Sequence, residues 1–171
     1  MMRTVRGKGT AIMKYLAMIY AVLLVGIDQL IKQLVCLYLK PVSTIPLIQD
    51  AVHLTYMENR GAAFSSMQGR YLFLVIFTSI VIIAGIIWIC ASKKDTPKLA
   101  LWSIATIIGG GIGNLLDRVF RGFVVDYIDF RIINFAVFNF ADICITCGTI
   151  LFAAYIIFSD FGRKNAGRGK K

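Results

Sequence analysis

The sequence is poor in acidic residues and in histidine, although it is 171 residues long. It has nine Asp and Glu residues against 19 Lys and Arg, with one His and four Cys. So few His and Cys residues argue against multi-ligand zinc sites and bis-histidine haem sites. We therefore expect no metal and no other cofactor. Charged residues make up only 16% and hydrophobic residues 58% of the chain, whereas soluble domains average about 25% and 45–50%. The composition excludes most soluble classes, and the length suits a single domain.

Four apolar segments are long enough to cross a bilayer, which takes about 20 residues of helix. They cover about residues 15–39, 71–91, 99–116 and 140–159. The second segment carries no charge, whereas the first contains Asp28 and Lys32. At a spacing of four these two side chains lie on the same side of a helix, where they can form an ion pair. The sequence therefore predicts a mainly α-helical membrane protein built on a four-transmembrane-helix bundle.

The basic residues indicate how the bundle is oriented. Twelve of the 19 Lys and Arg residues lie in residues 1–14, 92–98 and 160–171. Basic residues concentrate in cytoplasmic flanks, so these segments and both termini are predicted to be cytoplasmic, with residues 40–70 and 117–139 outside. The net charge of +10 then follows from topology, and no nucleic-acid partner is needed. Residues 1–36 resemble a signal peptide, but no small-x-small cleavage site follows, so we predict a retained first helix.

The external segments carry strand patterns. Val52, Leu54 and Tyr56 alternate with their neighbours as in a half-buried strand, and His53 is predicted to lie at the surface of that strand. Residues 121–131 are rich in Val, Ile, Phe and Tyr, which predicts a short strand pair or ribbon. We therefore expect a small extracytoplasmic β-sheet over the outer ends of the helices.

Five of the nine acidic residues lie in or next to apolar sequence, and the predicted topology places all five near the outer face. They are Asp28, Asp117, Asp126, Asp129 and Asp142. Ionisable residues at membrane depth are costly and mark functional sites by default. Carboxylates without a set of histidines favour acid–base chemistry by two Asp residues that share one proton, as in aspartic peptidases.

Two of these acids lack an obvious local partner. The other three have a basic residue close along the chain: Asp28 with Lys32, Asp117 with Arg118, and Asp129 with Arg131. Burying Asp126 and Asp142 would be expensive unless the two carboxylates pair. Structural explanations stay open for both. Asp142 could cap a helix together with Asn139, and Asp126 could pair with Arg118 or Arg121.

The third apolar segment contains the glycine-rich run Gly109-Gly110-Gly111-x-Gly113. It lacks the Lys-Ser/Thr of a phosphate-binding P-loop. Small residues at this spacing are typical of close packing between transmembrane helices, which is the interpretation we favour.

Five short motifs, in order along the chain, resemble those of the bacterial lipoprotein signal peptidases (signal peptidase II). They are Asp28-Gln29-x-x-Lys32; Asn59-x-Gly61-Ala62-Ala63-Phe64; Gly109-Gly110-x-x-Gly113-Asn114-x-x-Asp117-Arg118; Gly122-x-Val124-Val125-Asp126-Tyr127; and Phe138-Asn139-x-Ala141-Asp142. The sequence departs from the family pattern at three positions. Tyr127 stands where Phe is usual, Ala136 where Pro is common, and Ile143 where Ser is frequent.

The resemblance implies an aspartic endopeptidase that removes the signal peptide from diacylglyceryl-modified prolipoproteins just before the lipidated cysteine. It implies a catalytic dyad of Asp126 and Asp142, the same pair that the lack of local partners singles out. It further implies a substrate site lined by Asn59, Asn114, Arg118 and Asn139, with Asp28, Lys32 and Asp117 as structural support. Expected partners are lipid-modified prolipoproteins and membrane lipid. The expected protein is a monomer of the bacterial cytoplasmic membrane with its active site at the outer face.

Two other function classes compete with this interpretation. A carboxylate-lined transporter would spread its acids through the membrane depth or carry inverted repeats, and neither pattern is seen in the sequence. An assembly protein could use the glycine-rich segment for packing, but it would not need Asp126 and Asp142.

Overall fold

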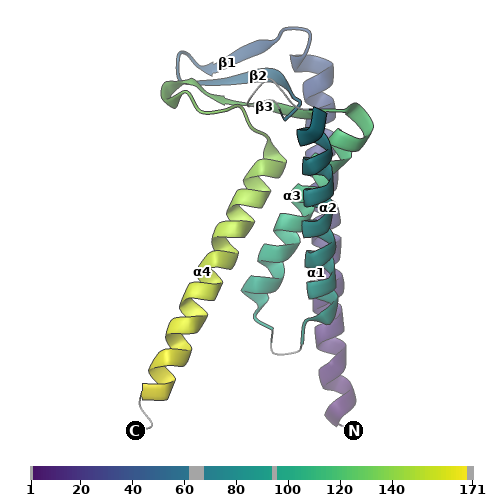
Figure 1. Cartoon of the computed structure of the whole chain (residues 1–171), viewed down its shortest axis with the longest axis vertical. Coiled ribbons are helices and arrows are strands. Elements are labelled where there is room, and N and C mark those ends of the chain that lie inside the picture. The colour runs from purple at the N-terminus through teal and green to yellow at the C-terminus, as the bar shows by residue number, and fades with distance from the viewer. Residues whose placement is uncertain (1, 62–67, 94–95, 169–171) are drawn as a thin grey trace.

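Four helices long and apolar enough to cross a membrane lie below a small sheet in the computed structural model (Figure 1). The structure describes the backbone of residues 2–61, 68–93 and 96–168, and the side chains of residues 11–61, 71–93 and 96–159. Helix α1 (Met2–Leu34) continues as a π-helical turn, η1 (Val35–Leu39). The other three are α2 (Gln68–Ala91), α3 (Lys98–Arg121) and α4 (Phe140–Arg168). Residues Ala62, Ala63 and Phe64 of the second motif lie outside the described residues.

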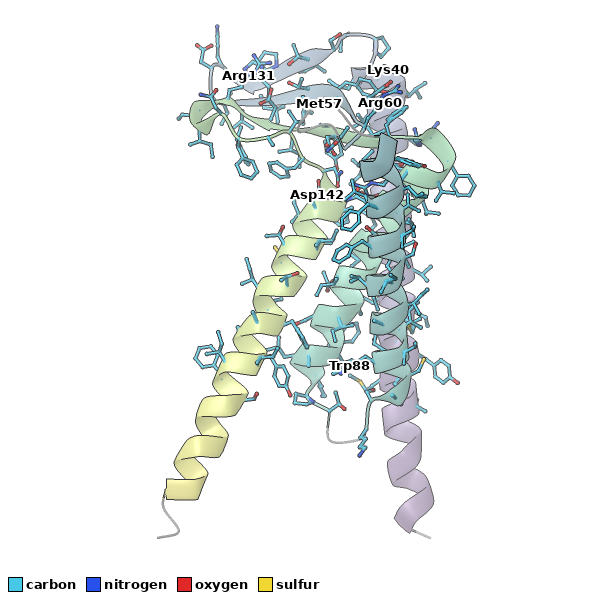
Figure 2. The ribbon with its side chains drawn as sticks, viewed as in Figure 1. Lys40, Met57, Arg60, Trp88, Arg131 and Asp142 are labelled. Atoms are coloured by element: carbon cyan, nitrogen blue, oxygen red, sulfur yellow. The ribbon has the colours of Figure 1, made fainter. Side chains whose placement is uncertain are left out.

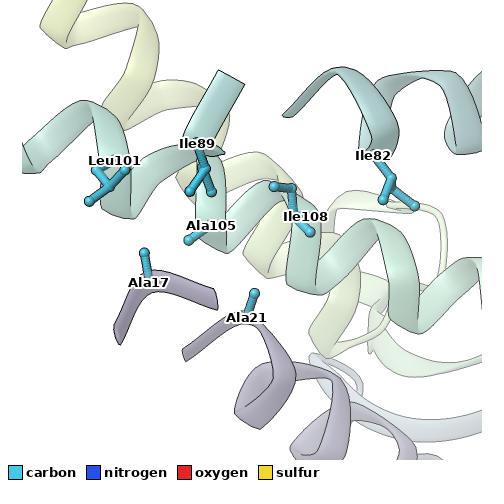
Figure 3. Packing of buried hydrophobic residues seen from close by; sticks show 7 residues of the cluster. All are labelled: Ala17, Ala21, Ile82, Ile89, Leu101, Ala105 and Ile108. Atoms are coloured by element: carbon cyan, nitrogen blue, oxygen red, sulfur yellow. The ribbon is translucent and has the colours of Figure 1, made fainter. Parts of the chain in front are cut away.

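Helix α3 is the central helix of the bundle. In its most apolar stretch 61% of the residues are buried, against 11–22% in the other three helices. The apolar core between α1, α2 and α3 contains small as well as branched side chains (Figure 3): Ala17, Ala21, Ile82, Ile89, Leu101, Ala105 and Ile108. Small residues let helix backbones approach closely, which favours association in a bilayer.

The glycines of α3 are required by close approach. A Cβ atom added at Gly113 would lie 2.5 Å from Oδ2 of Asp28 on α1. One added at Gly110 would clash with the carbonyl oxygen of Ala141 on α4. The glycine-rich run therefore packs α3 against both neighbours, which confirms the packing interpretation.

The sheet has three antiparallel strands in the order β1-β2-β3. They are β1 (Thr44–Ile48), β2 (Val52–Asn59) and β3 (Val124–Phe130). The strand pair predicted within residues 121–131 is wrong, because β3 is a single strand that pairs with β2 and a 3-10 turn, η2 (Arg131–Ile133), follows it. Helix α3 also runs past the predicted end at residue 116 and stops at Arg121, where Gly122 adopts a φ of 78°.

His53 is buried, contrary to the prediction that it lies at the surface. Only 7% of the residue is exposed. It belongs to the central strand, where Pro46 of β1 and Asp129 of β3 lie opposite it on the two sides. The alternating pattern located the strand correctly, but it could not reveal that both of its edges are covered.

A second apolar cluster joins the sheet to the bundle. Val125 and Tyr127 of β3 pack against Val35 and Leu39 at the end of the first membrane segment. Because this contact holds β3 against the helices, the strand that carries Asp126 lies directly above their upper ends (Figure 1).

Candidate active site

Asp126 is buried on β3 and is held by two side-chain amides. The Nδ2 atom of Asn59 donates a hydrogen bond to Oδ2 at 2.8 Å, and the Nδ2 atom of Asn139 donates to Oδ1 at 2.6 Å. No ion pair to Asp126 occurs among the described side chains, so the predicted alternative of a partner in Arg118 or Arg121 is not seen. Burial raises the pKa of Asp126 to about 6, against the lowering effect of the two amides, and the nearby charge of Asp142 also raises it.

Asp142 lies in the first turn of α4 and forms a reciprocal cap with Asn139. Its backbone N–H donates to Oδ1 of Asn139 at 3.0 Å, and its Oδ2 accepts the backbone N–H of Asn139 at 3.2 Å. The structural alternative for Asp142, a helix cap, is therefore present. It does not occupy the whole carboxylate, because Oδ1 accepts a separate hydrogen bond from Nδ2 of Asn114 at 2.7 Å.

Asn139 connects the two carboxylates. Its side chain binds Asp126 while its backbone N–H and its Oδ1 hold Asp142. Its Nδ2 atom also lies 3.1 Å from Oδ1 of Asn114, and the residue is fully buried. Asp126 and Asp142 thus come from a strand and a helix and meet through one amide below the sheet, where Figure 2 marks Asp142 at the upper end of α4. Among the described residues, this is the one place where two acids meet through shared amides without a basic partner.

Lys32 is the centre of a buried ion cluster next to these residues. Its Nζ atom lies 2.9 Å from Oδ2 of Asp28 and 3.0 Å from Oδ2 of Asp117, and it donates to Oδ1 of Asn114 at 2.9 Å. The pair expected between Asp28 and Lys32 is therefore formed. The side chains of all three ionised residues are almost completely buried, which requires close pairing to offset their lost hydration.

The partner predicted for Asp117 is wrong. Its carboxylate pairs with Lys32 and with Nε of Arg121, the latter at 3.3 Å, and not with Arg118. Residues next to each other on a helix point in different directions, whereas residues four apart share a side. Arg121 is four positions after Asp117, so helical spacing favours it over the immediate neighbour.

Asp28 and Asp117 hold the backbone beside each candidate catalytic residue. Oδ1 of Asp28 accepts the N–H of Ala141 at 3.1 Å, one residue before Asp142. Oδ2 of Asp117 accepts the N–H of Val125 at 3.0 Å, one residue before Asp126. The ion cluster therefore orients both carboxylates from the side of α1 and α3.

Arg118 and Asn59 lie at the edge of this arrangement. Arg118 follows Asn114 by one turn of α3, is half-buried, and its Nη1 donates to the Asn114 carbonyl at 3.3 Å. Asn59 ends β2 and, besides binding Asp126, accepts the N–H of Gly61 through Oδ1 at 2.9 Å. Both residues carry polar groups that can bind the backbone of an extended peptide.

Asp129 belongs to a different cluster, although it lies on the same strand as Asp126. Its Oδ2 accepts hydrogen bonds from Thr55 at 2.8 Å and from Nε of Arg131 at 3.0 Å. Burial would raise the pKa of Asp129, but these two bonds outweigh it and hold the pKa below its usual value. The predicted local pair with Arg131 is confirmed.

Tyr127 has a role that sequence reasoning missed. Its hydroxyl oxygen accepts the backbone N–H of Phe140 at 3.2 Å, at the start of α4. Burial raises the pKa of Tyr127 to about 12, so the hydroxyl stays neutral. The signal in the sequence is Tyr where the family pattern has Phe, a change that adds one acceptor for an otherwise free helix N–H.

Comparisons with known proteins show the family and the fold. The family model described as signal peptidase (SPase) II matches residues 20–158. A lipoprotein signal peptidase of Clostridioides difficile is 44% identical over 140 residues, which cover 80% of this chain and 91% of that protein. One from Caldanaerobacter subterraneus is 42% identical, over 84% and 97% of the two chains. A bacterial membrane enzyme solved by the in meso method matches with a TM-score of 0.73 and 30% identity, over 84% of this chain and 88% of that one.

Proposed function

The chain belongs to the signal peptidase II family, whose members cleave lipoprotein signal peptides, and from this premise we propose that it is an aspartic peptidase with Asp126 and Asp142 as its dyad. The family and the four apolar helices make the protein a multi-pass membrane peptidase. The aspartic mechanism, the site residues and the cleavage position are our proposal. The observation that carries it is the meeting of two acids through Asn139, with no basic partner for either among the described side chains.

The two carboxylates differ in a way that suits acid–base catalysis. The raised pKa of Asp126, about 6, favours its neutral form. Asp142 lies at the N-terminus of α4, where the helix dipole stabilises a negative charge. We therefore assign Asp126 as the acid and Asp142 as the base of a coupled pair, whose two titration steps belong to the pair as a whole.

The reaction then runs in two steps. Asp142 takes a proton from water, the resulting hydroxide forms a bond to the scissile carbonyl carbon, and Asp126 gives its proton to the carbonyl oxygen. In the second step Asp126 takes that proton back, the carbon–nitrogen bond breaks, and Asp142 gives its proton to the leaving amine. Both carboxyl groups return to their initial states, so no further reactant is consumed.

The substrate on this proposal is a prolipoprotein held in the membrane by its signal helix and by a diacylglyceryl group on cysteine. Cleavage falls just before that cysteine. Asn59, Asn114 and Arg118 bind the peptide backbone around the scissile bond, and Asn139 orients the dyad. We further propose that the enzyme works as a monomer in the bacterial cytoplasmic membrane, with both termini inside and the dyad at the outer face.

The two competing functions fit the contacts less well. A proton pathway needs titratable groups spread through the membrane depth, whereas these acids lie at one end of the helices. Asp28 and Asp117 are moreover held in ion pairs with Lys32 and Arg121. A purely structural role does not explain why Asp126 is buried with amides instead of a basic partner.

The deciding experiment replaces each dyad member with Asn in the full-length membrane protein. Cleavage of a lipidated precursor by Asp126→Asn and by Asp142→Asn is expected to fall by at least about 100-fold, the usual share of a general acid or base. Asp129→Asn is the matched control on the same strand, and it should stay close to wild type because Asp129 belongs to another cluster. Normal cleavage by either dyad variant would overturn the proposal. A peptide antibiotic that mimics the cleavage site should inhibit the wild-type enzyme.

A further inference from the structure

An apolar groove lies between α2 and α4 on the surface of α3. It encloses a cavity of about 160 Å³ lined by residues of all three helices: Phe77, Thr78, Val81, Ile82, Ile107, Ile108, Gly111 and Ile145. Gly111 leaves space in the groove, since a Cβ atom at this position would lie 3.3 Å from the Ile82 side chain.

The groove begins directly below the candidate active site. Gly111 precedes Asn114 by three residues on α3, and Ile145 follows Asp142 by three residues on α4. Residues three apart are neighbours on one helix face. Each of these two walls is therefore continuous with a residue of the dyad network, and a chain that reaches the dyad from the membrane would pass along the groove.

Two aromatic side chains meet farther along α2 and α4, seven residues beyond two of the residues that line the cavity. The rings of Trp88 on α2 and Phe152 on α4 meet edge to face, with their centroids 6.2 Å apart. Trp88 follows Val81 by seven residues and Phe152 follows Ile145 by seven, so each lies on the groove side of its helix. Figure 2 marks Trp88 near the lower end of α2 and Asp142 at the upper end of α4. We call this pair the aromatic bridge.

The distance between the dyad and the aromatic bridge corresponds to a short helix. Ten residues of α4 separate Asp142 from Phe152, which is about 15 Å at 1.5 Å per residue. Eleven residues of α2 separate Phe77 from Trp88, which is about 16 Å. A helix of about ten residues fills this length, and apolar regions of signal peptides are typically about 7–15 residues long.

We propose that the groove between α2 and α4 holds the apolar helical region of the substrate's signal peptide, and that the aromatic bridge of Trp88 and Phe152 limits the length of that region. This inference rests on the proposed peptidase function and deepens it. Trp88 and Phe152 are then specificity-determining residues that lie well away from the reacting atoms.

A groove-filling variant tests where the apolar region binds. Val81→Trp places a large ring in the groove without touching the dyad network. We expect it to lower cleavage of a lipidated precursor by at least about tenfold, while a short lipidated peptide without an apolar region is cut as by wild type. Phe158→Ala, on an α4 side chain that is 74% exposed, is the control and should leave both substrates unaffected.

A series of precursors with apolar regions of about 10, 13 and 16 residues, which run from the middle of the usual range to just beyond it, tests the length limit. Wild-type kcat/KM should fall by about tenfold from the shortest to the longest. Trp88→Ala and Phe152→Ala should flatten this dependence, and Phe158→Ala should retain it. A bridge that only stabilises the fold would instead lower cleavage equally at every length.

Two outcomes would overturn the inference. If kcat/KM depended on the length of the apolar region equally in the bridge variants and in wild type, the aromatic bridge would not limit that length. Unchanged precursor cleavage by Val81→Trp would mean that only bilayer lipid fills the groove. In both cases cleavage of the short peptide by the wild-type enzyme would still support the proposed function. A wild-type enzyme that cleaves none of these substrates would overturn the proposed function itself.

Discussion

Asn139 holds Asp126 and Asp142 through three different atoms. Its Nδ2 binds Asp126, while its backbone N–H and its Oδ1 form the reciprocal cap with Asp142. The cap that begins α4 and the link between the carboxylates are thus made by one residue. The cap and the contact with Asp126 use different atoms, so the structural interpretation of this motif leaves room for the catalytic role that we propose.

Replacing Asn139 with Ser separates the two roles. Ser is as good an N-cap as Asn, so the melting temperature in detergent should stay close to wild type. Ser lacks the amide that reaches Asp126, so kcat should fall by at least about 100-fold, as for loss of a general acid. Asn139→Ala is expected to lose stability as well as activity. Full activity of Asn139→Ser would show that the amide link is dispensable.

Asn59 controls the protonation of Asp126. Its hydrogen bond lowers the pKa of that carboxyl, so Asn59→Ala should raise the pKa further above about 6. The acid form then persists to higher pH, and the alkaline limb of the kcat/KM profile, which reports the pair as a whole, should move upward. Thr55→Ala removes a comparable bond from Asp129 and should leave the profile in place. A downward shift in Asn59→Ala would contradict the assignment of Asp126 as the acid.

At the scale of the elements, the Lys32 cluster joins parts of the fold that are far apart in sequence. Lys32 of α1 binds Asp117 of α3, Asp117 binds the backbone of β3, and Asp28 binds the backbone of α4. One buried ammonium group therefore connects the three elements that position the dyad.

Removing that ammonium group should destabilise the protein strongly. Lys32→Met leaves the buried carboxylate of Asp28 without a basic partner and that of Asp117 with Arg121 alone. Breaking a buried ion pair costs about 3–5 kcal/mol, so the melting temperature in detergent should drop accordingly. Lys40→Met makes the same change in an exposed pair with Glu58 and should leave the melting temperature unchanged. The triple variant Asp28→Asn, Lys32→Met, Asp117→Asn should recover part of the loss. An unchanged melting temperature for Lys32→Met would refute the role of the cluster.

At the scale of the whole molecule, the orientation in the membrane follows from charge. The described parts of the basic segments, residues 2–14, 92–93, 96–98 and 160–168, lie at the helix ends opposite the sheet. Positively charged flanks stay in the cytoplasm, which puts the sheet and the dyad on the outer side. This orientation is a proposal that reporter fusions can test.

A fluorescent protein fused to the C-terminus should fold and fluoresce, because that end is expected in the cytoplasm. Alkaline phosphatase inserted at the turn between β1 and β2, near Asp50, should be active, because it would reach the oxidising outer side. The reciprocal fusions should be inactive. Phosphatase activity from the C-terminal fusion would contradict the orientation and, with it, an outer active site.

Interactions between residues close along the chain were predictable. The apolar runs located the four helices, and the spacing of Asp28 and Lys32 indicated their ion pair. The signals failed where the answer depended on a distant partner. His53 is covered by strands on both sides, and Asp117 pairs with Lys32 of another helix.

The sequence by itself determined which segments enter the membrane and which two acids lack a local partner. Hydrophobicity and helical periodicity act over a few residues, so they can be recognised without a structure. Only the tertiary structure decided that those acids meet through Asn139, that Lys32 binds Asp28 and Asp117 beside them, and that Trp88 and Phe152 meet between α2 and α4. Such contacts depend on how whole elements pack, which no local pattern specifies. The scarcity of acidic residues became informative once their positions in space were known.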